Sequence, residues 1–432
     1  MPVDARDVAA QLPPPRHREG RSFTMEQLLD RIPDRSRVYV TPLMGPPTAI
    51  IEAMAAAPDR WSSLETTCDY LAEPLATFAH AGAPFRHLSV QASRALAPMA
   101  DAGALQIVSA CSSQLSGLYQ PGGPLAVDVV IVQVSPPGPD GRFSLGTSGG
   151  ATAELVRSAP IVLAEINPTM PYTRGVVEVE RSDFDGLVEV DPHPLVEFPS
   201  APRSEVTDRI GANVASQIPD GAVIEYGIGA IPDAALAALA GHRDLGFHSG
   251  MVGDAVIDLV EAGVMNGRRK TVDAGLIVAG GVVGTQRAVE WAAERDDVIL
   301  VGYNYSHGAA ALARQDRFTA INSALQVALD GSIGAEVVGG RVVSGPGGQP
   351  DFAYGASLST GGVSIVALQA TAAKGTVSRI VPAVAAGDLV TVPHYLADRV
   401  VTEHGVAALR GVGGEARAEA LRAIAAPGLL VT

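Results

Sequence analysis

Two apolar runs decide the fold. Val127-Asp128-Val129-Val130-Ile131-Val132-Gln133-Val134 ends at Ser135-Pro136-Pro137, and Ile161-Val162-Leu163-Ala164-Glu165-Ile166 ends at Asn167-Pro168. A strand with one solvated face alternates apolar and polar residues, whereas a strand covered on both faces is apolar almost throughout. Both runs therefore predict buried parallel strands, which occur in α/β proteins whose sheets carry helices on both faces.

The same pattern recurs along most of the chain, where short β-branched runs alternate with alanine-rich helical segments. Four prolines between residues 191 and 203 predict a connection between domains. We therefore expect two open, mostly parallel-sheet α/β domains. Residues 1–22 form an N-terminal arm, residues 23–200 the first domain, and residues 201–432 the second domain.

Composition excludes several classes of function. The 432 residues are 47% hydrophobic and 18% charged, so the chain can bury a large core and is not disordered. Its net charge of −15 argues against nucleic acid or an anionic membrane surface as a partner. The longest apolar stretches, such as residues 276–283, are far shorter than the ~20 residues that a membrane span needs.

The cysteine count and the N-terminus indicate the compartment. Cys68 and Cys111 are too few for a disulfide framework or a cysteine-rich metal site, and low cysteine usage fits a reducing cytosol. The first twenty residues contain acidic side chains and no apolar core, which is not the pattern of a signal peptide. The histidines have no metal-ligand spacing. We expect a cytoplasmic protein without a metal.

Three segments have the residue types of a phosphate or thioester site. Gly227-Ile228-Gly229-Ala230-Ile231-Pro232-Asp233 follows an apolar strand and opens a helix, where backbone N–H groups can approach an anion. Gly347 and Gly348 lie in a second glycine loop that can aim N–H groups at an oxyanion. Lys374 lies in a loop of small residues. Each also has a purely structural interpretation, as a tight turn or a solvated lysine.

Together with other stretches, these segments resemble the acetyl-CoA hydrolase/transferase family, which belongs to the class I CoA-transferases. The matching stretches keep their order and are 131–141 (IVQVSPPGPDG), 162–171 (VLAEINPTMP), 227–233 (GIGAIPD), 254–263 (DAVIDLVEAG), 320–326 (AINSALQ), 347–352 (GGQPDF), 375–382 (GTVSRIVP) and 400–411 (VVTEHGVAALRG). The resemblance implies acyl-CoA as substrate and no other cofactor. It also implies a glutamate nucleophile that forms a glutamyl-CoA thioester. Gly227 to Ile231, Gly348 and Lys374 match the CoA contacts of the family. A homodimer is expected, because relatives are commonly dimers.

The sequence departs from the family at three positions. Gly250, in Phe247-His248-Ser249-Gly250-Met251, occupies the place of the nucleophilic glutamate, and glycine has no side chain that could be acylated. Glu225 stands where similar relatives carry glutamine, and His307 stands where the family has an asparagine that contacts CoA. The missing side chain should leave room for a water or a larger acyl group.

We therefore expect an acyl-CoA-processing enzyme that uses water, by hydrolysis of the thioester or of a carbon–carbon bond. Glu225 and His248 are the candidate bases, because Glu225 shares a strand face with Gly227 and His248 lies two residues from Gly250. Either residue can instead be structural. One alternative is a CoA-transferase with Glu225 as nucleophile, and another is a non-catalytic acyl-CoA binder. The sequence does not identify the acyl group.

Overall fold

The computed structural model describes residues 4–5, 7–8, 12–14, 16–70, 72–81 and 84–429. The rest of the predicted arm and the last three residues lie outside this set. The chain forms two compact units. Unit 1 contains the residues up to Phe198 together with Val278–Tyr305, and unit 2 contains Pro199–Ile277 and the residues from Ser306 onward. No helix among the described residues is both long and apolar enough to cross a bilayer.

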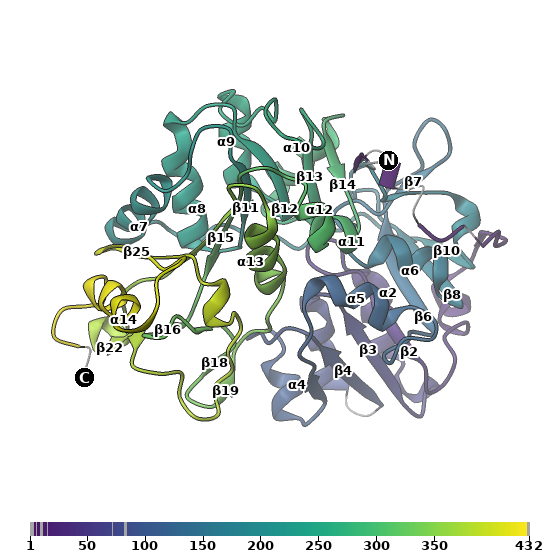
Figure 1. Cartoon of the computed structure of the whole chain (residues 1–432). Coiled ribbons are helices and arrows are strands. Elements are labelled where there is room, and N and C mark those ends of the chain that lie inside the picture. The colour runs from purple at the N-terminus through teal and green to yellow at the C-terminus, as the bar shows by residue number, and fades with distance from the viewer. Residues whose placement is uncertain are drawn as a thin grey trace. The chain divides into compact units, whose positions relative to one another are not determined.

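Unit 1 is built around a parallel sheet with strand order β1-β10-β8-β6-β2-β3-β4-β5 (Figure 1). Its elements are β1 (Arg21–Ser22), α1 (Met25–Leu29), β2 (Arg37–Val40), α2 (Thr48–Ala56), β3 (Leu64–Cys68), α3 (Phe78–Ala81), β4 (Phe85–Ser89), α4 (Ala97–Asp101), β5 (Leu105–Ile107), α5 (Ser112–Tyr119), β6 (Val129–Val134), β7 (Phe143–Ser144), α6 (Thr152–Ser158), β8 (Ile161–Ile166), β9 (Glu178–Val179), β10 (Gly186–Glu189), α10 (Gln286–Ala293) and β14 (Val298–Leu300). The two decisive runs form β6 and β8, which are paired in parallel and are buried almost throughout. The predicted α/β class with mostly parallel sheets is therefore confirmed.

The predicted arm ends in an edge strand. Arg21 and Ser22 pair in parallel with Gly186 and Leu187 of β10. The guanidinium of Arg18 lies 2.9 Å from the carboxylate of Asp185 and donates to three backbone carbonyls. Residues 21–22 thus belong to the sheet of unit 1, and Arg18 ties the residues before them to the same unit.

The second part of unit 1, residues 278–305, returns to the loops of the first part. It contains most of β13 (Ile277–Val282), and the N–H groups of Gly149 and Gly150 both donate to the carbonyl of Gly280. Val176 donates to Leu300, and Phe198 donates to Gly284. The sequence analysis places one boundary near residue 200, whereas the chain passes between the units at two further places.

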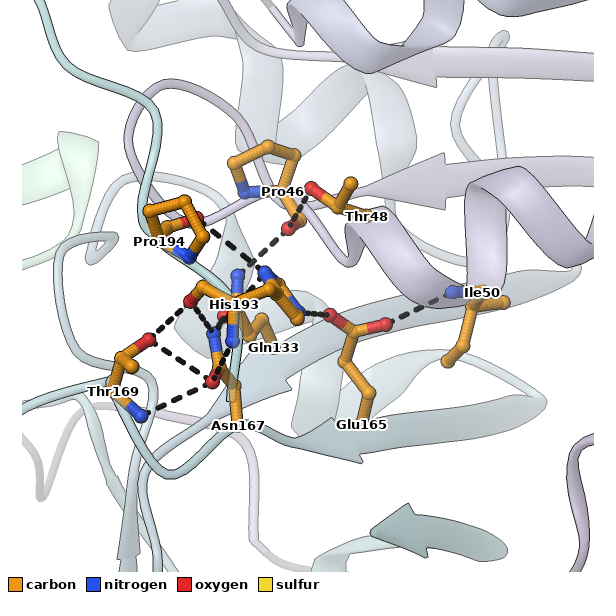
Figure 2. Close-up of polar contacts among 9 residues, drawn as sticks. All are labelled: Pro46, Thr48, Ile50, Gln133, Glu165, Asn167, Thr169, His193 and Pro194. Carbon is orange, nitrogen blue, oxygen red and sulfur yellow. Dashed lines mark hydrogen bonds and ion pairs between the residues drawn. The ribbon is translucent and has the colours of Figure 1, made fainter. Parts of the chain in front are cut away.

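A buried polar cluster lies where the strand order of unit 1 reverses, between β2 and β6. Figure 2 shows Glu165 of β8 with one carboxylate oxygen 3.1 Å from His193 Nε2 and the other accepting from the N–H of Ile50. Asn167 and Thr169 donate to the carbonyl of His193, so the proline-rich connection is tied to the end of β8. Glu165 is fully buried, and these contacts fit a structural role for its carboxylate.

Unit 2 carries a second sheet, in which its strands follow the order β12-β11-β15-β20-β24-β25. Its elements are α7 (Glu205–Ala215), β11 (Val223–Tyr226), α8 (Ala230–Ala237), β12 (Gly246–Val252), α9 (Asp254–Glu261), α12 (Ala309–Leu312), β15 (Phe318–Ser323), β16 (Gln326–Ala328), β17 (Ile333–Gly334), β18 (Val337–Val338), β19 (Arg341–Val342), α13 (Gln349–Leu358), β20 (Val363–Ala367), β21 (Thr371–Ala372), β22 (Val377–Ser378), β23 (Ile380–Val381), β24 (Arg399–Thr402), β25 (Gly405–Ala408) and α14 (Gly414–Ala423), with α11 (Tyr303–Ser306) at the boundary. The pairs in this order are parallel except for the hairpin of β24 and β25.

One face of this sheet positions the candidate site. Val223 pairs with Gly246 on one side and with Phe318 on the other, so residues an even number of positions further along share that face. Helices α12 and α13 cover it through Leu312, Phe352 and Ala356, which pack on Val223, Phe318 and Ala320. At the ends of β11 and β15, the same face becomes polar.

Candidate active site

Glu225 lies on β11, on the face covered by α13. Its carboxylate accepts a hydrogen bond of 2.7 Å from the side-chain amide of Asn322, on the neighbouring strand β15. Burial removes water from the carboxylate and raises its pKa well above the ordinary value, while the bonds from Asn322 and Ile321 oppose this only in part. Burial thus lets Glu225 exchange a proton at a higher pH than an ordinary carboxyl does.

His248 lies on the same face, on the other neighbour of β11. Val223 and Ile224 pair with Gly246 and Phe247, and continuing this register places Glu225 beside His248. The imidazole is fully buried, and its Nδ1 lies 3.4 Å from the amide nitrogen of Gln315. The structure thus brings the two candidate bases to adjacent strands.

Gly250 follows His248 on this face, and the imidazole of His307 borders the space where its side chain would be. A Cβ atom built on Gly250 would lie 3.0 Å from Nε2 and 3.1 Å from Cε1 of His307. A Cβ atom built on Gly348 would lie 2.5 Å from both Cδ2 and Nε2 of the same ring. The expected room beside residue 250 is thus bounded by an imidazole, which the sequence analysis does not anticipate.

The imidazole of His307 is held on its other sides as well. Its Nδ1 lies 2.9 Å from the hydroxyl of Ser306, and its ring centroid lies 4.4 Å from that of Phe352. Burial and the nearby imidazole of His248 lower the pKa of His307 to about 3. The ring is therefore neutral at physiological pH.

The predicted CoA turn forms the start of α8. Gly229 is the residue before the helix and has a φ of 133°, a conformation that favours glycine. The N–H of Gly227 donates to Ile321, and a Cβ atom at Gly227 would lie 3.0 Å from Asn322 Oδ1. Ile228 is 47% exposed, so the turn presents an apolar side chain to its surroundings.

The remaining two predicted contacts lie in different places. Gly347, with a φ of 55°, and Gly348 form the turn that leads into α13, directly beside His307. Lys374 lies on the exposed turn Ala373–Gly375 between β21 and β22, with φ 57° and ψ 39°. Contacts in unit 2 join the turn of Gly227 to Glu225 through Asn322, and Gly250 to Gly348 through His307. No such contact joins Lys374 to these groups among the described residues.

Four further residues of the site had no assigned role at the sequence level: Ser306, Gln315, Asn322 and Phe352. Asn322 and Phe352 lie inside two of the matching stretches, 320–326 and 347–352, and Ser306 directly precedes His307. For Asn322 and Phe352, the matching stretches could therefore have indicated a role in the site. Gln315 had no such signal.

Comparison with known proteins identifies the class. The acetyl-CoA hydrolase/transferase N-terminal domain matches residues 24–198, and the C-terminal domain of the same family matches residues 284–429. The chain belongs to the acetyl-CoA hydrolase/transferase family. It is an enzyme of the acyl-CoA hydrolase or CoA-transferase kind.

Individual relatives agree with this family. The chain is 36% identical to the 4-hydroxybutyrate coenzyme A transferase of Clostridium kluyveri over 406 residues, 94% of each chain. Its structure is similar to RipA of Yersinia pestis, with a TM-score of 0.88 at 28% identity, covering 98% of this chain and 96% of RipA. It is also similar to a 4-hydroxybutyrate CoA-transferase of Porphyromonas gingivalis, with a TM-score of 0.78 at 31% identity over 93% of each.

Proposed function

We propose that this protein hydrolyses an acyl-CoA by attack of water, without an acylated side chain at residue 250. The observation that carries the proposal is Gly250 itself. It lies buried on β12, in the place that the family resemblance assigns to a nucleophilic glutamate, and the ring of His307 borders the position of its Cβ atom. Residue 250 thus has no carboxylate, and the imidazole of His307 lies beside the place where that side chain would begin.

The reaction needs a base, and the site offers two. Glu225 and His248 lie on adjacent strands of the face that carries Gly250. The water oxygen bonds to the acyl carbon, the carbon–sulfur bond breaks, and one proton passes through the base to the departing thiolate. The products are CoA and a carboxylic acid. For a β-keto or cyclic acyl-CoA, the same water could cleave a carbon–carbon bond instead.

The CoA contacts are part of the same proposal. The turn of Gly227, Ile228, Gly229, Ala230 and Ile231, the loop of Gly347 and Gly348, His307 and Lys374 are proposed to contact CoA. We assign no cofactor beyond CoA as substrate, and no metal. A cytoplasmic homodimer is retained as a proposal. The location is supported by Cys68 and Cys111, which form no disulfide in the part of the chain that the structure describes. The homodimer is supported by the family, and light scattering of the purified chain tests it.

A second candidate function is CoA transfer with Glu225 as the nucleophile. The position of Glu225 favours it, because this carboxyl lies on the same face as Gly227 and Gly250. A thioester bound at the turn of Gly227 would contact the atoms at this edge of the face. The acceptor would then be a second carboxylic acid, as the relatives named transferases imply.

Thiol release separates the two reactions. The enzyme is incubated with acetyl-, butyryl-, succinyl- and 4-hydroxybutyryl-CoA, and free thiol is measured with and without added acetate or succinate. Hydrolysis predicts release without an acceptor acid and no adduct after trapping with hydroxylamine. Transfer through Glu225 predicts formation of the new acyl-CoA from the added acid, together with an adduct on Glu225 in the mass spectrum. The second result would overturn the proposal of hydrolysis.

A further inference from the structure

The ring of His307 lies between two glycines. A Cβ atom built on Gly250 would have Nε2 of this ring as its nearest atom, at 3.0 Å. A Cβ atom built on Gly348 would have Nε2 and Cδ2 as its nearest atoms, both at 2.5 Å. Contacts below 3.0 Å are not tolerated without movement. An alanine at 348 would therefore displace the ring of His307 and also that of Phe352, whose Cε2 would lie 2.7 Å from the new methyl group, whereas an alanine at 250 would press on His307. The present ring position therefore depends on both glycines.

The ring is also fixed in orientation. Ser306 meets Nδ1 on one side, and the ring of Phe352 lies against its face at an interplanar angle of 35°. Ser306, His307 and Phe352 are all buried. Burying an imidazole costs free energy of desolvation that an aliphatic side chain in the same place would not incur. A polar ring held so firmly beside a buried glycine in the candidate site suggests a role in the reaction.

We propose that His307 is a positioning residue, whose imidazole sets where the attacking water meets the acyl carbon beside Gly250. This inference rests on the proposed hydrolytic function. A neutral imidazole carries one N–H donor and one acceptor nitrogen, so it can orient water or a thioester oxygen without placing a full charge in the site. Reacting atoms must approach to about 3 Å in a defined direction, and a shift of about 1 Å can cost a factor of 10² in rate.

The ring can be moved without being removed. Gly348→Ala should displace it most and Gly250→Ala less, because the two new methyl groups would start 2.5 and 3.0 Å from the imidazole. Gly241→Ala is the matched control, since a Cβ atom there meets no atom within 4 Å. His307→Ala removes the ring, and His307→Gln restores a polar end of similar reach.

The experiment measures kcat and KM for thiol release without an acceptor acid, CoA binding by calorimetry, and the melting temperature of each variant. We expect kcat to fall roughly 10- to 100-fold in His307→Ala and Gly348→Ala, and less in Gly250→Ala. Gly241→Ala should match the wild type. His307→Gln should recover part of kcat, with CoA binding within about threefold of the wild type, which a role confined to packing does not predict.

A double-mutant cycle separates the ring from direct contact of Gly348 with CoA. If Gly348→Ala acts through the ring, it should have little further effect on kcat in the His307→Ala background. An undiminished effect there, or a His307→Ala variant with unchanged kcat, would overturn the role of His307 and leave hydrolysis standing. If His307→Ala does not fold, an unchanged kcat in both folded glycine variants overturns the role of His307. If the wild type releases thiol only with an acceptor acid, both proposals fail.

Discussion

Two buried glutamates, one in each unit, have different surroundings. Glu165 in unit 1 and Glu225 in unit 2 both lie on inner strands of a parallel sheet and are almost fully buried. Glu165 meets an imidazole at 3.1 Å and a backbone N–H at the first turn of α2. Glu225 meets the neutral amide of Asn322. Burial raises the pKa of both carboxyls, and that of Glu225 the more strongly.

This difference separates a structural carboxyl from a reactive one. The imidazole beside Glu165 has its own pKa raised, first by its hydrogen bond to the carboxylate, so this contact favours the protonated ring and ties the proline-rich connection to unit 1. Glu225 has no cation among the groups that set its pKa, so no opposite charge offsets the cost of burying its carboxylate. The first arrangement holds a segment in place, and the second favours proton exchange.

Replacing each glutamate by its amide is the strongest test of this contrast. Glu225→Gln should lower kcat for thiol release about 10²- to 10⁴-fold, because a general base is lost, while the melting temperature stays equal or rises. Glu165→Gln is the matched control and should lower the melting temperature with kcat changed less than about threefold. Stopped-flow thiol assays and calorimetric melts measure both. A stability loss in Glu225→Gln with unchanged kcat would reverse the two roles.

The pH dependence of the rate sharpens the assignment of Glu225. A base must be ionised, and burial raises the pKa of this carboxyl well above its ordinary value. We therefore expect kcat to fall about tenfold per pH unit below that raised pKa and to level off above it. Initial rates between pH 5 and 9 measure this, in overlapping buffers. The residual activity of Glu225→Gln should not show this decrease at low pH. If the decrease persists in the variant, another group is responsible for it.

His193→Gln tests the partner of Glu165. The folded pKa of His193 is raised above the unfolded value, so its stabilising effect is complete below about pH 6.5 and is lost as the pH rises through the folded pKa. We expect the variant to lose about 1–2 kcal/mol of unfolding free energy at pH 6 and less at pH 8.5. Urea unfolding at the two pH values measures the difference. An equal loss at both would show that charge plays no part in this contact.

The smallest effect is expected at Lys374, which lies on an exposed turn. Lys374→Ala should weaken CoA binding about three- to tenfold, because a solvated contact between a lysine and a phosphate contributes about 1 kcal/mol. The effect should diminish at high salt, since screening weakens such pairs. Calorimetric titration with CoA at low and high salt, with Arg268→Ala as a second exposed cation for comparison, measures it. Unaltered affinity at low salt would remove Lys374 from the proposed site.

Local pattern predicted much of the fold. The continuous apolar runs predicted β6 and β8 to within two residues. No strand was predicted over Gly246–Val252, because Gly246, Ser249 and Gly250 have low strand propensity and β12 depends on its neighbours in the sheet. The return of residues 278–305 to unit 1 depends on hydrogen bonds to distant loops, which no local pattern encodes.

The candidate site was predictable residue by residue but not as an arrangement. Glu225, His248, Gly250, His307 and Gly348 could each be singled out by residue type and by matching stretches. The position of the His307 ring beside Gly250 could not, because it depends on how the chain after α11 folds against β12 and α13. Sequence therefore supplied the members of the site, and tertiary packing supplied their neighbours.

The short strand β1 has a consequence for how the chain behaves in concentrated solution. Arg21 and Ser22 occupy the hydrogen-bonding groups along the outer side of β10, and Arg18 anchors them through Asp185. Without this segment, β10 would offer open backbone donors and acceptors to any extended peptide. The pairing with β1 therefore covers part of an edge that could otherwise add a strand from a second molecule.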